Sequence, residues 1–214
     1  YRPFMEREHH IWGTGFLSYL NGHDNQFLFK NVHIHSLRGE LTRKRVEVIL
    51  HKNLDVPLGD GGLLADQWVK PMTEKKYRIG IIPHFREKDH PLISEMLRFY
   101  SDSVLVDLEA PPVEVVQKIA SCELILSSSL HGLIIADSYH IPNRHMRLYP
   151  FGERIVGDGY KFADYYSSFG LEDCSFDATQ KRWPACSDIA SGYEISPVDV
   201  EKKKKSIYEA FPKL

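Results

Sequence analysis

The sequence is poor in the features that mark several large classes of protein. Its 214 residues hold only three cysteines (Cys122, Cys174 and Cys186), whose odd number and spacing suggest neither a disulfide framework nor a zinc site. No apolar run approaches the roughly 18 residues of a membrane span. A formal charge of −2 lacks the basic excess of a general nucleic-acid-binding protein. We therefore expect a folded protein of the reducing cytoplasm, without a metal site or a nucleic-acid partner.

The chain is nevertheless rich enough in apolar residues to form real cores. Apolar residues make up 43% and aromatic residues 12% of the sequence, and its length suits one large domain or two small ones. The polar stretch KPMTEKK at 70–76 separates two apolar patterns and reads as a linker. We predict an N-terminal domain at 1–70, a second domain at 71–170, and a helical and irregular tail at 171–214.

Strand and helix patterns alternate in the second half of the chain. Strands are expected at 77–83, 104–107 and 122–126, and helices at 92–100, at 113–120 and after His131. This rhythm predicts an α/β fold with a parallel sheet, whose ligands bind at the carboxyl ends of the strands. His84 and Arg86 follow the first strand, and the serine turn 127–129 follows the third. We expect these loops to converge on one crevice.

The stretch ELILSSSLHGLIIADSYHIPN at 123–143 is the most informative part of the sequence. An apolar strand ends in serines that precede a short apolar helix. Because a helix start leaves N–H groups unpaired beside the positive end of its dipole, Ser128 and Ser129 mark a candidate anion site. His131 is placed to exchange a proton there, and Gly132 leaves room for a ligand. Alternatively, the serines only cap the helix and His131 fills a niche in the core.

Further candidates lie in the first 70 residues. Gly13 and Thr14, in WGTGF, form a tight turn of the kind found beside phosphates and sugars, or an ordinary turn. Arg38 sits in a turn beside a glycine, where its guanidinium could meet a carboxylate or phosphate. Asp60, in GDGGLL, either caps a helix or acts on a sugar hydroxyl. His33 and His35 share one face of a strand but lack a third ligand, so we expect surface residues there and no metal.

Several of these stretches together resemble one family. SSSLHGLIIADSYHIPN is similar to the signature of the bacterial polysaccharide pyruvyl transferases, and WGTGF, LRGELT, GDGGLL, IGIIPHF and KFADYYSSFG agree with that family in the same order, over residues 12–170. The resemblance implies a fold similar to the two-domain GT-B glycosyltransferases, with an N-terminal acceptor-side domain and a C-terminal donor-binding domain. Family members have further strands before WGTGF, so the N-terminal domain is expected to be truncated.

The resemblance also implies a reaction without a cofactor. The enolpyruvyl group of phosphoenolpyruvate, the donor substrate, is transferred to a sugar as a pyruvate ketal. His131 would protonate the methylene carbon, and Ser128 and Ser129, with Arg38 or Arg86, would hold the anion. Some members carry an arginine at the position of Ser129, and Arg86 is the expected replacement.

The acceptor implied by the resemblance is a saccharide or lipid-linked saccharide. Asp164 and Tyr165 would border its site, unless the aromatic stripe around them is core. Contact with the inner face of a membrane and the oligomeric state are left open. Two other functions also fit the sequence. One is a nucleotide-sugar glycosyltransferase, although no acidic residue is clearly placed for a ribose, and the other is a non-catalytic saccharide-binding remnant.

Overall fold

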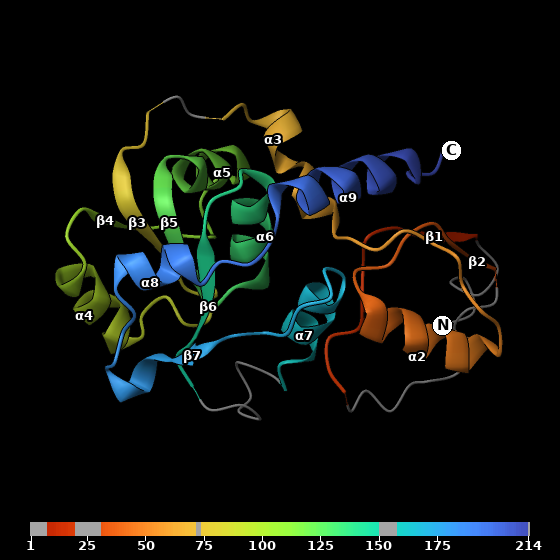
Figure 1. The fold of residues 1–214 in the computed structure, drawn as a ribbon, viewed down its shortest axis with the longest axis horizontal. Helices are drawn as coiled ribbons and strands as arrows, with labels where there is room; N and C mark the ends of the chain where they lie inside the picture. The colour runs from red at the N-terminus through yellow and green to blue at the C-terminus, as the bar shows by residue number, and fades with distance from the viewer. Residues whose placement is uncertain (1–7, 20–30, 72–73, 150–157, 214) are drawn as a thin grey trace. The chain divides into compact units, whose positions relative to one another are not determined.

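The computed structural model describes residues 8–19, 31–71, 74–149 and 158–213. The chain forms two compact units (Figure 1). Unit 1 comprises residues 1–61, 158–172 and 201–214, and unit 2 comprises residues 62–157 and 173–200. The chain therefore passes between the two units four times, and each unit is built from segments that are distant in sequence.

Unit 2 is built around a parallel sheet of five strands in the order β4-β3-β5-β6-β7. The strands are β3 (Tyr77–Ile82), β4 (Ser103–Leu105), β5 (Cys122–Ser127), β6 (Asn143–Arg147) and β7 (Phe176–Asp177). The two central strands are almost wholly buried, as their continuous apolar runs require when both faces of a parallel sheet are covered. The three strands predicted from the sequence are confirmed as β3, β4 and β5.

Helices cover both faces of this sheet. The elements that cover it are α4 (Pro91–Phe99), α5 (Pro112–Ala120), α6 (Leu130–Ser138) and α8 (Cys186–Ser191), and α3 (Ala65–Trp68) contacts α6. One core cluster joins α4 and α8 to the sheet through Met96 and Ile189, while the other joins α5 and α6 through Ile119 and Ala136. The predicted helices are confirmed as α4, α5 and α6. This three-layer arrangement is Rossmann-like, whereas the GT-B pairing of two such domains stays a prediction.

The strand order places a switch point between β3 and β5. From β3 the chain moves outward to β4 on one side, and it then returns to build β5 and β6 on the other side. Ile82 at the end of β3 is in register with Ser127 at the end of β5. Ligands of open α/β sheets bind outside the carboxyl ends of the strands at such a point. The loops that start at Pro83 and Ser128 therefore occupy the expected binding edge.

Unit 1 contains a smaller parallel arrangement. Strands β1 (His9–Ile11) and β2 (Val32–Ile34) pair in parallel, and two bridges, Thr14 with Leu37 and Leu37 with Leu58, extend the arrangement to a third segment. Helices α2 (Glu40–Leu50) and α7 (Tyr160–Ser167) pack on each other, and α9 (Pro197–Glu209) contributes its residues from 201 onward to this unit. Within the described ranges, no helix of either unit is long and apolar enough to cross a bilayer.

The compact units differ from the domain limits predicted at residues 70 and 170. The predicted linker 70–76, which lies partly outside the described residues, belongs to unit 2. Just before it, the Val69 carbonyl at the end of α3 accepts a hydrogen bond of 2.5 Å from the hydroxyl of Tyr139 at the end of α6. Helix α7 belongs to unit 1 because it packs on α2. Residues 171–196, predicted to be irregular, contain β7 and α8. Both elements are too short to show a sequence period.

Candidate active site

The serine turn after β5 holds the loop after β3 against the edge of the sheet. The Ser128 N–H donates to the Ile82 carbonyl at 3.0 Å, and the Ser128 hydroxyl accepts the His84 N–H at 2.9 Å. The same hydroxyl donates to the carboxylate of Glu87, a buried residue that the sequence analysis missed. These bonds confirm that the loops after β3 and β5 converge. They also occupy the Ser128 hydroxyl, so its predicted contact with an anion would compete with the loop contacts.

The hydroxyl of Ser127 is likewise used inside the protein. Its oxygen lies 3.0 Å from the Ile82 carbonyl and 2.8 Å from the Ser129 carbonyl, and it accepts the Ser129 N–H at 3.0 Å. Ser129 is the N-cap of α6 and has an extended backbone, but its hydroxyl makes no capping bond. In the described part of the chain this hydroxyl has no hydrogen-bond partner. Of the three serines, Ser129 therefore offers a side-chain donor to a ligand.

The first turn of α6 offers further donors. The earliest bonds of the helix run from the N–H groups of Gly132 and Leu133 to the Ser129 carbonyl, at 3.1 and 3.4 Å. Among the residues that the structure describes, the N–H groups of Leu130 and His131 have no acceptor. Together with the Ser129 hydroxyl and the helix dipole, they form a group of donors suited to an anion.

The side chain of His131 lies on the outside of this turn. His131 is exposed, whereas its neighbours Leu130 and Gly132 are buried. The alternative in which His131 fills a niche in the core is therefore wrong. An imidazole that reaches solvent beside unpaired N–H groups is accessible to a bound anion and placed to give it a proton.

Gly132 serves packing between α6 and the sheet. A Cβ atom at this position would lie 2.4 Å from the Ser127 Oγ and 3.1 Å from the Ile82 Cγ2. Both neighbours belong to the ends of the central strands, which have little freedom to move. The close approach that we predicted for a ligand is thus taken by the protein's own side chains.

Replacement of Gly132 by alanine is expected to destabilise the protein by about 1–3 kcal/mol, since overpacking of a tight interior costs that much. Urea unfolding followed by circular dichroism measures the change. Gly170→Ala is not a suitable control because Gly170 has a positive φ of 72°. Ser94→Ala, on the exposed side of α4, is the better control. A Gly132→Ala variant as stable as the wild type would contradict this packing role.

The loop after β3 supplies a cation to the same edge. Arg86 is exposed, and its guanidinium carbon lies 5.4 Å from the centre of the Phe85 ring. The Arg86 N–H donates to the His84 Nδ1 at 3.4 Å, and the His84 ring packs on Phe85 with 4.4 Å between centroids. His84 itself is half-buried. The structure thus brings His84, Arg86 and the serine turn together at one sheet edge.

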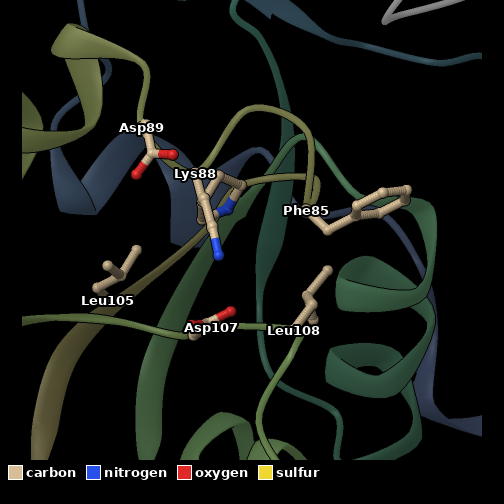
Figure 2. A pocket seen from close by; sticks show the side chains of 7 residues that line it. Phe85, Lys88, Asp89, Leu105, Asp107 and Leu108 are labelled. Atoms are coloured by element: carbon tan, nitrogen blue, oxygen red, sulfur yellow. The ribbon is translucent and has the colours of Figure 1, made fainter.

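A pocket of about 200 Å³ opens between this loop, β4 and the loop after β4 (Figure 2). It is lined by Pro83, Phe85, Lys88, Asp89, Leu105, Asp107 and Leu108. The Lys88 ammonium forms an ion pair with Glu109. The hydrogen bond with Glu109 raises the pKa of Lys88 above its ordinary value, and the nearby carboxylates of Asp107 and Asp89 add to this. Lys88 therefore stays charged at neutral pH.

The candidates of unit 1 also meet at the carboxyl ends of parallel segments. The Arg38 N–H donates to the Thr14 carbonyl at 2.9 Å. A Cβ on Gly13, whose φ is +64°, would lie 2.8 Å from the N of Gly61, next to Asp60. The structure thus brings Gly13, Thr14, Arg38 and Asp60 together within unit 1. Their predicted action alongside His131, which belongs to unit 2, stays a prediction.

Arg38 is largely engaged by the protein itself. The residue is 7% exposed; its Nε donates to the Asp164 carboxylate at 2.9 Å and its Nη2 to the Phe16 carbonyl at 2.5 Å. Asp164 also accepts the Thr42 N–H at 2.8 Å, in the first turn of α2. Arg38 and the first turn of α2 therefore bind the protein's own Asp164 carboxylate, at the position where they would otherwise bind an external anion. A donor contact by Arg38 would have to use Nη1 or the second N–H of Nη2.

Asp164 and Tyr165 do not border an open site. Both residues are fully buried, at 0% exposure. The expectation that they line the acceptor site is wrong, and the alternative in which this aromatic stripe is core is confirmed. His10 of β1 stacks on His33 of β2 and on His35, which directly follows β2. In the described residues they form no group arranged to hold a metal.

The fold makes unit 2 a Rossmann-like domain with a candidate ligand site at its switch point. Residues 63–147, which include β3, β5, the serine turn and His131, match the family model described as polysaccharide pyruvyl transferase. This match confirms, over residues 63–147, the resemblance inferred from the sequence.

A viral protein is also similar to this chain. Uncharacterized protein L143 of Acanthamoeba polyphaga mimivirus is 34% identical to it over 148 residues, which cover 67% of this chain and 50% of the relative. The chain thus spans half the length of the relative. Since this relative is viral, a bacterial origin stays a prediction.

Proposed function

We propose that the protein transfers the enolpyruvyl group of phosphoenolpyruvate to a sugar of a polysaccharide or its precursor, as a pyruvate ketal. The observation that carries the proposal is the exposed His131 on the first turn of α6, beside N–H groups without an acceptor in the described residues. This turn lies at the switch point of the sheet and within the stretch that matches the pyruvyl transferase model. The family match supports the reaction class, and the geometry of this turn supports the roles proposed for His131 and the N–H groups.

The chemistry divides among these groups in a definite way. The N–H groups of Leu130 and His131, the Ser129 hydroxyl and Arg86 hold the carboxylate and phosphate of the donor. The His131 imidazolium gives its proton to the methylene carbon, and the electron pair of the double bond forms the new C–H bond. One sugar hydroxyl adds to C2 and passes its proton to the His131 imidazole, and phosphate leaves with the electrons of the C2–O bond. A second hydroxyl then adds to C2, passes its proton to the leaving phosphate and closes the ketal.

The test is phosphate release from phosphoenolpyruvate in the presence of saccharides that contain galactose or mannose. The proposal expects release that depends on the acceptor, and a new methyl signal of a ketal in the proton NMR spectrum of the product. A flat trace with every acceptor, or release without a ketal, contradicts it. A flat trace together with saccharide binding would instead favour a non-catalytic binding protein.

Arg86→Ala is expected to raise the KM for phosphoenolpyruvate roughly 10- to 100-fold, because a hydrogen bond to a charged group contributes about 1.5–3 kcal/mol. The thermal midpoint should stay unchanged, since Arg86 is exposed. Steady-state kinetics measure the effect. Arg98→Ala, which removes an exposed arginine from α4, is the matched control. Equal KM values for the two variants would remove Arg86 from the donor site.

One observation favours a second candidate, a transferase that uses a nucleotide sugar. Asp107 follows β4, the strand beside β3, and in dinucleotide-binding folds an acidic residue further along from the first βα turn binds a ribose hydroxyl. The sequence alone did not reveal this residue because the strand order was unknown. Thermal-shift measurements with phosphoenolpyruvate and with nucleotide sugars separate the two functions. Stabilisation by a nucleotide sugar alone would favour the second.

A further inference from the structure

The pocket between the loops after β3 and β4 carries the wrong charge for the anionic donor. Its single cation, Lys88, is paired with Glu109. The carboxylates of Asp89 and Asp107 therefore leave the lining negative, and Figure 2 shows the Lys88 ammonium extended toward Asp107. A negative lining repels a phosphate and a carboxylate. The lining therefore favours an uncharged or cationic occupant.

The polar groups of the pocket are acceptors suited to hydroxyls. Asp107 Oδ1 accepts the Glu109 N–H at 2.9 Å. Across the described ranges, neither the second oxygen of Asp107 nor the carboxylate of Asp89 has a hydrogen-bond partner. An ionised carboxylate accepts hydrogen bonds on two oxygens and so can bind neighbouring hydroxyls of one ring.

The remaining walls of the pocket are apolar. Phe85 and Leu108 stand on one side of the opening, and Leu105 lies on the other (Figure 2). Phe85 is 46% exposed, so its ring is open to contact with a ligand. A ring with hydroxyls at its edge and C–H bonds on its faces matches this combination of carboxylates and an exposed aromatic ring.

The volume limits the size of the occupant. Sites for drug-sized ligands have volumes of roughly 300–1,000 Å³, whereas this pocket has about 200 Å³. One sugar ring fits such a volume better than a complete nucleotide sugar.

We propose that this pocket binds one uncharged sugar ring of the acceptor, with Asp107 and Asp89 accepting bonds from its hydroxyls and Phe85 packing on its C–H face. The inference rests on the proposed function and deepens it, because it assigns acceptor and donor to opposite sides of one loop. Phe85 stands in the chain between His84 and Arg86, the candidates for donor binding, and both of their side chains lie near its ring. The loop can therefore bring a sugar hydroxyl to C2 of the donor.

The experiment uses the whole chain labelled with ¹⁵N and two separate titrations. Methyl α-D-galactopyranoside and methyl α-D-mannopyranoside serve as uncharged probes, and phosphoenolpyruvate serves as the charged one. The sugars should shift the amide signals of residues 85–89 and 107–108, and phosphoenolpyruvate should shift those of residues 129–132. Absence of any shift with both sugars at saturating concentration overturns the inference. Shifts of the pocket amides by phosphoenolpyruvate alone overturn it too.

Asp107→Asn sharpens the test. The asparagine oxygen can still accept the Glu109 N–H, so the loop is retained, but the charge is lost. The dissociation constant of the bound sugar should rise about tenfold, the effect of losing one hydrogen bond to a charged group. Glu114→Gln, which removes an exposed charge from α5, is the control. Equal affinity of the two variants contradicts the role of Asp107.

The outcomes separate this inference from the proposed function. Ketal formation without sugar binding in the pocket would overturn the inference and leave the proposed function standing. Sugar binding in the pocket without turnover of phosphoenolpyruvate would overturn the proposed function and leave the pocket as a sugar-binding site.

Discussion

Replacement of His131 by alanine is expected to lower the rate of pyruvyl transfer at least 100-fold, because a positioned general acid contributes roughly 10²–10⁴-fold to a rate. The thermal midpoint should stay that of the wild type, since the side chain is exposed and leaves no cavity. Binding of phosphoenolpyruvate should weaken little, because the N–H donors of the first turn of α6 are backbone groups. The rate of phosphate release and a thermal-shift titration together measure these three properties.

The variants around this position distinguish proton transfer from positioning. His131→Gln keeps a hydrogen-bonding side chain but has no proton to give at neutral pH, so it should be as inactive as His131→Ala. If the imidazole only orients the donor, His131→Gln should retain much of the activity. His33→Ala, which removes an exposed histidine from the small sheet of unit 1, is the control. Wild-type turnover by His131→Ala would exclude His131 from the mechanism.

The sequence predicted the centre of unit 2 because local signals there are strong. Strands β3 and β5 are continuous apolar runs between polar turns, and α6 follows a serine-rich turn. Since consecutive parallel strands place their carboxyl ends at one edge, the meeting of His84 and the serine turn also followed from the pattern. The family match of residues 63–147 covers this same region.

The missed features depend on partners that are distant in sequence. Glu87 lies in the charged stretch REKD, which is typical of a solvated loop, yet its carboxylate is buried against Ser128. Strand β7 has two residues and exists only because it pairs with β6. Arg38 was assigned to an external anion because its partner Asp164 lies 126 positions further along the chain. Neither periodicity nor local composition encodes such pairings.

The contact between Arg38 and Asp164 changes what a substitution of Arg38 would report. From the sequence alone, Arg38 was assigned to the binding of the donor anion. In the structure the side chain of Asp164 is 0% exposed and that of Arg38 is 8% exposed. Removal of Arg38 would leave a buried carboxylate without its counter-ion, so we expect lower stability as well. Arg86→Ala is therefore the clean test of the donor site.

Asp164→Ala is expected to destabilise unit 1 by about 3–5 kcal/mol, since removal of one partner leaves a buried charge uncompensated. The carboxylate accepts bonds from the Arg38 Nε and from the N–H and hydroxyl of Thr42, at 2.9, 2.8 and 2.7 Å. It thereby joins α7 to the first turn of α2. A Cβ on Gly39 would lie 1.7 Å from the Asp164 carbonyl oxygen, so the two backbones are in close contact and cannot easily close around the lost side chain.

Urea unfolding followed by far-ultraviolet circular dichroism measures the loss, with Asp55→Ala as the control because Asp55 is an exposed acid of the same unit. The double variant Arg38→Met with Asp164→Leu should recover a large part of the lost stability, because apolar residues of similar volume replace a buried ion pair at little cost. If Asp164→Ala lowers the free energy of unfolding by less than about 1 kcal/mol, the loss is smaller than expected for a broken buried ion pair. That result would show that water reaches this carboxylate. Arg38 would then again be a candidate for binding the donor.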